Sequence, residues 1–418
     1  MSKRRVVVIG GGPAGLMAAG QAAQCGAEAV LLEKGPRLAR KLRISGKGRG
    51  NLTNTADLPE FIEAFAPNGK FLYSTFSRYF RDELLAFLAD LGVPTKVERG
   101  GRVFPVSDRA ADVADALSRH VESVGVTVRL NTKARAVAVE DNGVVGVEVF
   151  GGVMKADAVV LAAGGASYPA TGSTGDGYEM AKAVGHTIVP PQPGLSAMDV
   201  KQRWIGDLEG LSLRNVEVSL VTPSTESSRN KPAASEFGEM VFTDSGVSGP
   251  VILTLSRDAR FLLAKGKVEL SIDLKAALSE EQIHSRLLRD FRRAKHFKNY
   301  LDELLPRKLI PTFIRLVGIP QDKRTNTITA EERTAIVSLL KDFRLSISRL
   351  RPLEEAIVTA GGVSISEIDP RTLMSKLVGG LFLAGEVIDI DAKTGGYNLQ
   401  AAFSTGFVAG QSAGCEPA

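Results

Sequence analysis

The sequence is poor in the residues that build disulfide frameworks and metal centres. Its 418 residues include only two cysteines, Cys25 and Cys415, so we expect no disulfide framework and a reducing, cytoplasmic setting. No apolar run approaches the ~18 residues that a membrane-spanning helix requires, so we expect no membrane span. The histidines lack Cys or His neighbours at metal-ligand spacing, which disfavours a zinc site; they are His120, His186, His284 and His296.

The excess of positive charge is also small. Lys and Arg number 52 against 47 Asp and Glu, and a net charge of +5 over this length does not indicate a nucleic-acid partner. We interpret the densest basic stretch, Arg286–Lys298, as a solvated helix face, with a binding patch as the alternative. Residues 3–20 have the outline of a signal peptide, but a signal peptide needs neither four glycines within residues 10–15 nor an acid after a second strand. A cytoplasmic location remains the simplest expectation.

Glycine, by contrast, is abundant and clustered. The 43 glycines are about 10 % of the chain, against a usual ~7 %. They lack a three-residue period and are accompanied by only 19 prolines, which excludes collagen-like and disordered chains. Residues 1–50, 151–185 and 361–410 hold 10, 8 and 9 of them. We expect these three segments to contain tight turns and ligand contacts.

The order of the expected elements predicts an α/β fold. Residues 5–9 and 28–32 are typical of buried parallel strands, and a glycine turn and a helix over 14–25 lie between them, as in a βαβ unit. Further strands are expected at 157–163 and 381–384, and a last helix at 398–412. We predict a Rossmann-like nucleotide-binding domain built from both chain ends, residues 1–190 and 351–418. Its insertion comprises a β-rich subdomain over 191–278 and a small, charged helical subdomain over 279–350.

The first glycine cluster carries a dinucleotide fingerprint. Residues 10–15 are GGGPAG, a G-x-G-x-x-G motif that follows an expected strand and opens an expected helix. Gly10 permits the tight turn, Gly12 lets a pyrophosphate approach the backbone, and Gly15 lets the helix pack on the strand. Glu33 ends the second strand, where a carboxylate accepts the ribose hydroxyls and repels a 2′-phosphate. The motif therefore favours FAD or NAD over NADP at this site.

The C-terminal glycine cluster favours FAD. Residues 380–386, GLFLAGE, predict a strand, a turn and an acid, and residues 394–398, TGGYN, lead into the last helix. A helix N-terminus beside a flavin can stabilise the reduced anion of the flavin. No second G-x-G-x-x-G follows a strand, so we expect a single dinucleotide site.

The loop over residues 40–54 suits a phosphate and a flavin. Arg40 and Lys41 can neutralise pyrophosphate charge, and Asn51 can hydrogen-bond the edge of the ring system. A solvated basic loop is the alternative. The glycines that would let the backbone lie flat against a ring are Gly46, Gly48 and Gly50.

Several longer motifs carry a family resemblance. They are RKLRISGKGRGNLTN at 40–54, GRVFPVS at 101–107, TGSTGDGY at 171–178, Phe242-Thr243 followed by Gly249-Pro250, AGE at 384–386 and TGGYNLQ at 394–400. With the fingerprint, they cover essentially the whole chain. They resemble a bacterial flavoprotein family that includes a dehydro-bile-acid reductase and an aminoacetone oxidase.

This resemblance implies a non-covalent FAD in a domain similar to those of glutathione reductase and fumarate reductase, with a two-part insertion. Asp176 falls in a segment similar to one in flavin-dependent fumarate reductases, although a helix cap would also account for it. The residues predicted to bind FAD are Gly10, Gly12, Pro13, Ala14, Gly15, Glu33, Lys34, Arg40, Lys41, Ser45, Gly46, Gly48, Arg49, Asn51, Ala163, Gly164, Asp176, Gly385, Glu386, Gly395, Gly396, Tyr397, Asn398 and Leu399.

The chain departs from the family pattern at three places. Gly50 stands where a cysteine is common, and Asp244 stands where a histidine is common. Ala392 and Lys393 replace a glycine and an aromatic residue before the last motif. If these positions face the flavin, the substrate chemistry differs from that of better-known relatives.

We predict a reductase in which NADH or NADPH reduces the flavin, and flavin N5 passes hydride to an activated C=C bond of an enone, such as a dehydro-bile-acid or steroid-like small molecule. Tyr397 and Lys393 are the first candidates for polarising or protonating the substrate, followed by Tyr168 and Arg49. One alternative is an amine or amino-ketone oxidase that uses O₂ and produces peroxide. Another is an RNA-directed or non-catalytic flavoprotein that docks through the basic stretch. A serine hydrolase is disfavoured because Ser248 lacks G-x-S-x-G spacing.

Overall fold

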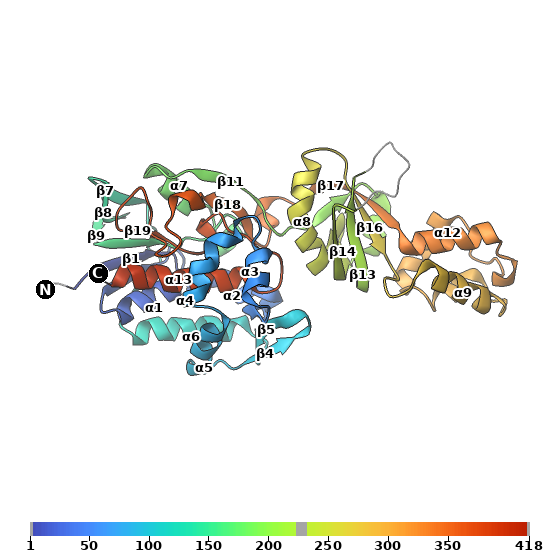
Figure 1. The fold of residues 1–418 in the computed structure, drawn as a ribbon, viewed down its shortest axis with the longest axis horizontal. Helices are drawn as coiled ribbons and strands as arrows, with labels where there is room; N and C mark the ends of the chain where they lie inside the picture. The colour runs from blue at the N-terminus through green and yellow to red at the C-terminus, as the bar shows by residue number, and fades with distance from the viewer. Residues whose placement is uncertain (1–2, 223–231, 416–418) are drawn as a thin grey trace. The chain divides into compact units, whose positions relative to one another are not determined.

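A computed structural model of the protein describes residues 3–222 and 232–415. The chain forms two compact units, which we describe separately. The terminal unit comprises Met1–Gly194 and Leu353–Ala418, and the inserted unit comprises Leu195–Pro352. The terminal unit is therefore built from the first and the last parts of the chain, whose helices α1 and α13 are drawn in blue and red in Figure 1.

A five-stranded parallel sheet forms the centre of the terminal unit. Its order is β19-β10-β1-β2-β6, so strands from the two ends of the chain share one sheet. The middle residues of β1, Val6 to Val8, are fully buried, which explains the continuous apolar run in the sequence. The strands are β1 (Arg5–Ile9), β2 (Glu28–Leu32), β6 (Thr127–Arg129), β10 (Ala158–Leu161) and β19 (Leu381–Leu383).

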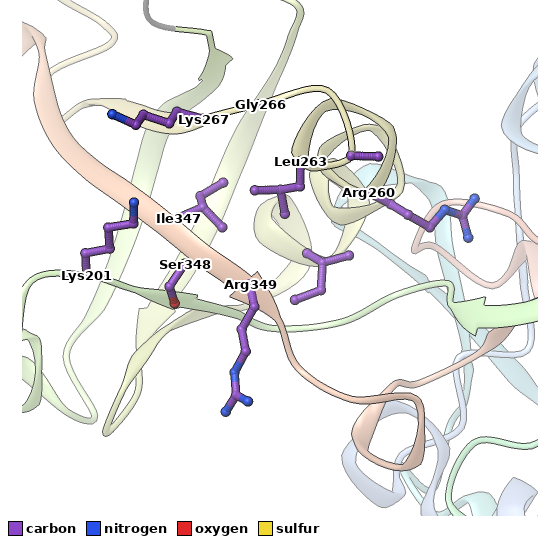
Figure 2. Close-up of a pocket in the computed structure, with 10 residues that line it drawn as sticks. Lys201, Arg260, Leu263, Gly266, Lys267, Ile347, Ser348 and Arg349 are labelled. Atoms are coloured by element: carbon purple, nitrogen blue, oxygen red, sulfur yellow. The ribbon is translucent and has the colours of Figure 1, made fainter.

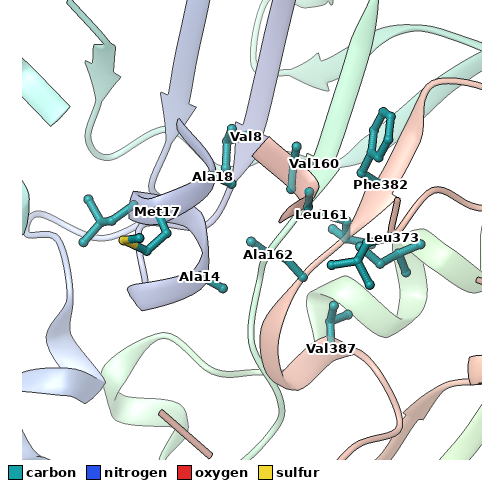
Figure 3. Close-up of a cluster of buried hydrophobic side chains, with 14 of the residues drawn as sticks. Val8, Ala14, Met17, Ala18, Val160, Leu161, Ala162, Leu373, Phe382 and Val387 are labelled. Carbon is teal, nitrogen blue, oxygen red and sulfur yellow. The ribbon is translucent and has the colours of Figure 1, made fainter. Parts of the chain in front are cut away.

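Two long helices pack closely beside this sheet. They are α1 (Pro13–Gln24) and α13 (Tyr397–Gly414). A Cβ at Gly406 or Gly410 would lie 2.3 Å from the carbonyl oxygen of Ala14 or Ala18, so only glycine allows this approach. Figure 3 shows the α1 residues Ala14, Met17 and Ala18 in the same buried cluster as residues of β1, β10 and β19. The cluster joins the two chain ends through one hydrophobic core.

Smaller elements surround this core in the terminal unit. The helices are α2 (Arg40–Ile44), α3 (Leu58–Ala64), α4 (Tyr73–Arg78), α5 (Arg81–Asp90), α6 (Ala110–Ser123) and α7 (Asp176–Ala183). Three small antiparallel sheets have the orders β3-β5-β4, β7-β8-β9 and β11-β18. Their strands are β3 (Thr53–Asn54), β4 (Thr95–Glu98), β5 (Arg102–Pro105), β7 (Ala136–Glu140), β8 (Gly143–Val149), β9 (Gly152–Lys155), β11 (Ile188–Pro193) and β18 (Thr359–Val363).

The inserted unit contains a closed antiparallel barrel with the order β12-β15-β14-β13-β16-β17. Its strands are β12 (Met198–Val200), β13 (Ser212–Val221), β14 (Ala234–Phe242), β15 (Gly246–Ser248), β16 (Glu269–Asp273) and β17 (Phe343–Leu350). Its helices are α8 (Pro250–Leu263), α9 (Glu280–Phe291), α10 (Phe297–Leu301), α11 (Ile310–Val317) and α12 (Ala330–Lys341). One hydrophobic cluster extends through the barrel and the helices.

Strand β17 corrects one expectation from the sequence. The charged sequence of 279–350 predicts a helical subdomain, but residues 343–350 form a strand that pairs with both β16 and β12. Its buried residues alternate with exposed or half-buried ones, since Phe343, Leu345 and Ile347 point into the core. The alternation of apolar residues in β17 is difficult to recognise in the sequence, because the strand is short, contains charged residues and directly follows helix α12.

The predicted fold class is confirmed. The chain is an α/β protein with a parallel, Rossmann-like core built from both ends and an insertion that contains β-strands and helices. None of the helices in the described ranges combines the length and the apolar character needed to cross a bilayer.

Candidate functional site

The glycine turn between β1 and α1 leaves an open face at the start of the helix. A Cβ at Gly10 would lie 2.4 Å from the carbonyl oxygen of Ala162, and one at Gly15 would lie 1.8 Å from that of Gly10. These two glycines are therefore required by the fold itself. Gly12, the N-cap of α1, has no neighbouring atom within 4 Å of its Cβ position. An anion can approach the free N–H groups of α1 from this side.

The acid after β2 lies beside the same turn. Glu33 accepts hydrogen bonds from the backbone N–H groups of Gly11, at 2.9 Å, and Gly35, at 2.7 Å. Pro13 occupies the first turn of α1 and Ala14 is buried behind it. The structure thus brings the fingerprint and its carboxylate together.

The loop over residues 45–53 contains buried polar atoms that have no hydrogen-bond partner within the described chain. They are Ser45 Oγ, Asn51 Oδ1 and Thr53 Oγ1. Buried polar groups are nearly always satisfied in native proteins, so these atoms indicate a polar ligand. Gly46 and Gly48 adopt left-handed conformations, with φ of 56° and 84°, and Gly48 has no neighbour within 4 Å of its Cβ position.

The predicted cations of the site form ion pairs and hydrogen bonds to the surrounding loops. Lys41 Nζ lies 2.8 Å from a Glu386 carboxylate oxygen and donates to Ser167 Oγ at 2.7 Å. Lys34 pairs with Asp176 at 2.8 Å. Arg40 donates a hydrogen bond to the carbonyl oxygen of Ala170, in the segment before α7.

Asp176 is the first residue of α7. The N-cap of this helix is Gly175, and no side chain makes an N-cap hydrogen bond. The helix-cap alternative for Asp176 is therefore wrong. Its carboxylate faces Lys34 and Lys133 instead.

Arg49 belongs to a separate ionic cluster. Its guanidinium hydrogen-bonds Glu98 and Asp108 and lies 4.3 Å from the ring centroid of Phe104. The hydrogen bonds from Arg49 lower the pKa of Glu98, and those from Lys96 and then Arg49 lower the pKa of Asp108. The assignments of Arg49 to FAD and to catalysis stay predictions.

The turn after β19 approaches the start of α1. Gly385 has a φ of 76°, and a Cβ there would lie 2.8 Å from the Cβ of Ala14. Glu386, the next residue, accepts a hydrogen bond from the backbone N–H of Thr359 at 2.7 Å. Ala163 and Gly164 follow β10 in the neighbouring position of the sheet. The carboxyl ends of β1, β10 and β19 therefore meet, as expected for a ligand site of an open parallel sheet.

The start of α13 forms a tightly held corner. Gly396 is the N-cap, and a Cβ there would lie 2.3 Å from the carbonyl oxygen of Thr53. Asn398 accepts from the backbone N–H of Ala392 and donates to its carbonyl oxygen. Asn54 donates to the carbonyl oxygen of Gly395 at 3.0 Å. Leu399 follows in the first turn and is half-buried.

Two of the three predicted catalytic residues lie together at this corner. Lys393 Nζ is 5.9 Å from the ring centroid of Tyr397, which is 7 % exposed and packs edge-on against Phe61 at 4.6 Å. Tyr168 lies elsewhere, in the loop between β10 and α7, with an exposed side chain.

A cavity of about 360 Å³ opens beside this corner, and Tyr397 is in its wall. Its other lining residues are Asn54, Thr55, Ala56, Asp57, Glu60, Gly100 and Gly101.

Sequence reasoning missed several polar residues of the site. Thr53 and Gln400 each carry a buried oxygen without a partner in the described chain, and Asn54 joins two loops through the carbonyl oxygens of Gly100 and Gly395. Thr53 and Asn54 lie in the motif at 40–54, and Gln400 lies in the motif at 394–400. A stricter signal would have been their uncharged polar side chains among otherwise apolar or glycine positions.

Two of the three departures from the family pattern, Gly50 and Asp244, have local explanations. Gly50 has a φ of 77°, and a Cβ there would lie 3.1 Å from Ala110, so a larger side chain is disfavoured. Asp244 pairs with Arg351 at 2.6 Å, and the hydrogen bond from Arg351 lowers the pKa of Asp244. Asp244 is therefore a charged acceptor at neutral pH and cannot replace a histidine as a proton donor.

The residues of the terminal unit fit FAD. The open Gly12 face would hold the pyrophosphate, Glu33 the adenosine ribose, and the unpartnered oxygens of Ser45, Asn51 and Thr53 the flavin half. The described residues contain no group of three or more His, Cys, Asp or Glu side chains suited to a metal ion.

A second cavity, of about 580 Å³, lies on the barrel of the inserted unit. Its floor is apolar, with Leu263 and Ile347 among the lining residues. Figure 2 shows four cations around this floor with charged ends that point in different directions; they are Lys201, Arg260, Lys267 and Arg349.

The sequence matches the family model described as the HI0933-like protein Rossmann domain over residues 4–412. The chain belongs to the HI0933-like family. The family resemblance predicted from the motifs is thereby confirmed.

Two relatives of known name match over nearly their full length. The 3-dehydro-bile acid delta(4,6)-reductase of Clostridium scindens is 30 % identical, over 99 % of this chain and 100 % of that one. A ribosomal RNA dihydrouridine synthase of Escherichia coli is 28 % identical, over 98 % of each chain.

Solved structures show the same fold at low identity. The 3-ketosteroid delta1-dehydrogenase of Sterolibacterium denitrificans is 12 % identical, with a TM-score of 0.54 over 97 % of this chain and 98 % of that chain. The FrdA chain of E. coli quinol fumarate reductase is 17 % identical, with a TM-score of 0.51 over 99 % and 70 %. The family match and the reductase relative, together with residues that fit the cofactor, show that the chain is an FAD-dependent oxidoreductase.

Proposed function

We propose that this FAD-dependent oxidoreductase uses NADH or NADPH to reduce a C=C bond that is conjugated with a carbonyl group in a small molecule such as a dehydro-bile acid. The observation that carries the proposal is the cavity beside the start of α13, with Tyr397 in its wall and Lys393 next to it. The names of the relatives point to the same chemistry. One is a reductase of 3-dehydro-bile acids, and dihydrouridine is uridine with two hydrogens added across a bond conjugated with a carbonyl.

FAD, when bound, supplies hydride transfer to the carbon β to the carbonyl. The work of the chain is to hold the substrate and to move a proton. The hydroxyl group of Tyr397 donates a proton to the part of the substrate that carries the carbonyl group. The positive charge of the Lys393 ammonium then stabilises the phenolate of Tyr397. Asn54 and Asn398 fix the loop that carries both residues, so that the donor stays in position.

The experiment is anaerobic mixing of the FAD-loaded protein with NADH or NADPH, followed by addition of a conjugated enone. We expect one nicotinamide to bleach the flavin and the enone to restore its colour. Failure of both nicotinamides to bleach the flavin overturns the donor assignment. Peroxide formation that depends on an amine or amino-ketone, without enone turnover, would favour the oxidase instead.

A uridine within RNA is the second candidate substrate, because the positive charge of the chain is unevenly distributed. The terminal unit carries 26 Lys and Arg against 27 Asp and Glu, whereas the inserted unit carries 26 against 20, a net charge of +6. Lys201 and Lys267, at the barrel cavity, have no ion-pair partner within the described residues. Cations that point in different directions suit an extended polyanion better than a single phosphate.

The predicted basic stretch is a weaker RNA candidate than the barrel cavity. Much of it is neutralised: Arg286 and Arg289 pair with Asp290, and Arg293 and Lys295 pair with Glu303.

A double variant, Lys201→Ala with Lys267→Ala, tests the RNA substrate. If RNA binds at the barrel cavity, the variant should weaken RNA binding and lower the salt slope of log K by up to ~2, about 1 per lost phosphate contact. Reduction of a small enone should be unchanged. Absent RNA binding leaves the small-molecule substrate as the function, and equal RNA binding in the variant excludes the barrel cavity as the RNA site.

A further inference from the structure

The only two cysteines of the chain lie against each other. Cys25 follows the last residue of α1, and Cys415 follows the last residue of α13. Their sulfur atoms are 2.8 Å apart although 390 positions separate them in the sequence. Both are free thiols, with Cys415 exposed and Cys25 half-buried.

Close helix packing holds this pair in place. Gly406, Gly410 and Gly414 of α13 meet Ala14, Ala18 and Ala22 of α1 in the same order, so the two helices run in the same direction. A Cβ at Gly414 would lie 3.1 Å from the Cβ of Cys25, which shows how close the last turns approach. The contact therefore follows from the packing of two long helices rather than from a loose chain end.

The two thiols differ in their surroundings. Burial, and then the adjacent Cys415, raise the pKa of Cys25 to about 11. A thiol with a raised pKa holds little thiolate and is a poor first nucleophile. The exposed Cys415 is therefore the more accessible thiol of the pair, and Cys25 lies directly beside it.

We propose that Cys25 and Cys415 form a peroxide-oxidised disulfide that ties the end of α1 to the end of α13. The sulfur of Cys415 attacks one oxygen of hydrogen peroxide; an S–O bond forms, the O–O bond breaks, and water leaves. The sulfur of Cys25 then attacks the resulting sulfenic acid; the S–S bond forms, the S–O bond breaks, and a second water leaves. Two thiols have lost two electrons and two protons, and one peroxide has become two waters.

This modification would act on the helices that bear the cofactor site. The first turn of α1 begins at the open Gly12 face, which would hold the pyrophosphate, and the first turn of α13 carries Tyr397. A bond between their last turns closes a very long loop and restricts the unfolded chain. The oxidised protein should therefore unfold, and release FAD, at a higher temperature than the reduced protein.

The test treats the FAD-loaded protein with hydrogen peroxide and counts free thiols after denaturation. We expect the count to fall from two per chain to none, with an intact mass lower by about 2 Da and full recovery in dithiothreitol. Mass gains of about 16 or 32 Da without the 2 Da loss, disulfide-linked dimers, or no loss of thiols would each overturn the proposal.

Matched variants separate the disulfide from general oxidation. Cys25→Ser and Cys415→Ser each keep one thiol and the same helix packing. We expect neither to show the 2 Da loss or the peroxide-induced rise in melting temperature. A rise of the same size in either variant would show that the stabilisation does not come from this bond.

Discussion

The two units of the chain differ in glycine content and in net charge. The terminal unit holds 36 of the 43 glycines, and it is close to neutral. The inserted unit holds seven glycines and a net charge of +6. The terminal unit therefore exposes backbone, through turns such as that at Gly12, whereas the inserted unit exposes side chains, as at Lys201. We propose that the exposed backbone of the terminal unit serves the cofactor, and that the cations of the inserted unit would serve only the alternative RNA substrate.

The largest expected effect is in the glycine turn of the terminal unit. Gly15→Ala places a methyl group 1.8 Å from the carbonyl oxygen of Gly10, so α1 must shift. We expect purified protein without flavin colour and an unfolding free energy lower by about 3 kcal/mol. Visible absorbance and denaturant unfolding measure both.

Gly12→Ala separates cofactor binding from folding better than Gly15→Ala does. Gly12 has backbone angles that alanine can adopt, and its Cβ position lies in open space. The protein should fold normally but bind FAD about tenfold more weakly, near 1.4 kcal/mol. Gly379→Ala, whose nearest atom is 3.6 Å away, is the control and should bind FAD normally. If the unchanged protein, Gly12→Ala and Gly379→Ala bind FAD with equal affinity, the exposed backbone at Gly12 does not hold the cofactor.

The next prediction concerns Tyr397 and distinguishes a loss of catalytic rate from a loss of cofactor binding. Tyr397→Phe keeps the ring against Phe61 but removes the proposed proton donor, so we expect kcat to fall about 100-fold with little change in flavin content. Steady-state kinetics and the pH profile measure this. Tyr168→Phe, in the exposed loop, should keep normal turnover. A normal kcat for Tyr397→Phe would move the proton donor elsewhere.

A smaller effect is expected where side chains support the cofactor loops. Lys41→Met removes the partly buried ion pair with Glu386 and the hydrogen bond to Ser167. We expect FAD affinity to drop by about 1 kcal/mol, since such pairs are partly screened by solvent. Fluorescence titration with FAD measures this affinity. The affinity should depend less on salt concentration in the variant than in the unchanged protein. An unchanged affinity would mean that Lys41 serves the loops alone.

The smallest effect concerns the stability of the inserted unit in acid. Burial alone would raise the pKa of Asp199, but hydrogen bonds from Ser245, Arg349 and Arg351 outweigh it and lower that pKa. A lowered pKa adds stability above the unfolded-state value of about 3.9, and this stability is lost as pH falls below about 4. Asp199→Asn should cost about 1 kcal/mol at neutral pH and flatten the loss in acid.

Denaturant unfolding between neutral and acidic pH checks this expectation. The control is Asp244→Asn at the more exposed partner of Arg351, for which we expect a smaller loss. Flavin content should not change in either variant, because both positions belong to the inserted unit. A colourless Asp199→Asn protein would contradict the separation of the two units.

The sequence predicted the terminal unit better than the inserted one for physical reasons. Buried strands such as β1 and the turn around Gly15 depend on local sequence, since steric limits fix which residues fit there. The closure of the barrel by β17 joins strands separated by a run of helices, and no local pattern announces that pairing. Arg49 shows the same limit, because its partners Glu98 and Asp108 come from distant segments.

Whole-chain charge was a poor guide as well. A net of +5 averaged over 418 residues hid an uneven distribution between the units. The sequence marks Thr53 and Gln400 only as uncharged polar residues within motifs, and their lack of a hydrogen-bond partner follows from their burial in the structure.

The most direct test of the proposed reaction is anaerobic re-oxidation of chemically reduced, FAD-loaded protein by a conjugated enone. We predict that the flavin colour returns while the absorbance of the conjugated bond disappears, with one bond reduced per flavin. If the flavin stays reduced with every enone and uridine substrate, and regains colour only with O₂ and the release of peroxide, the C=C reductase is contradicted.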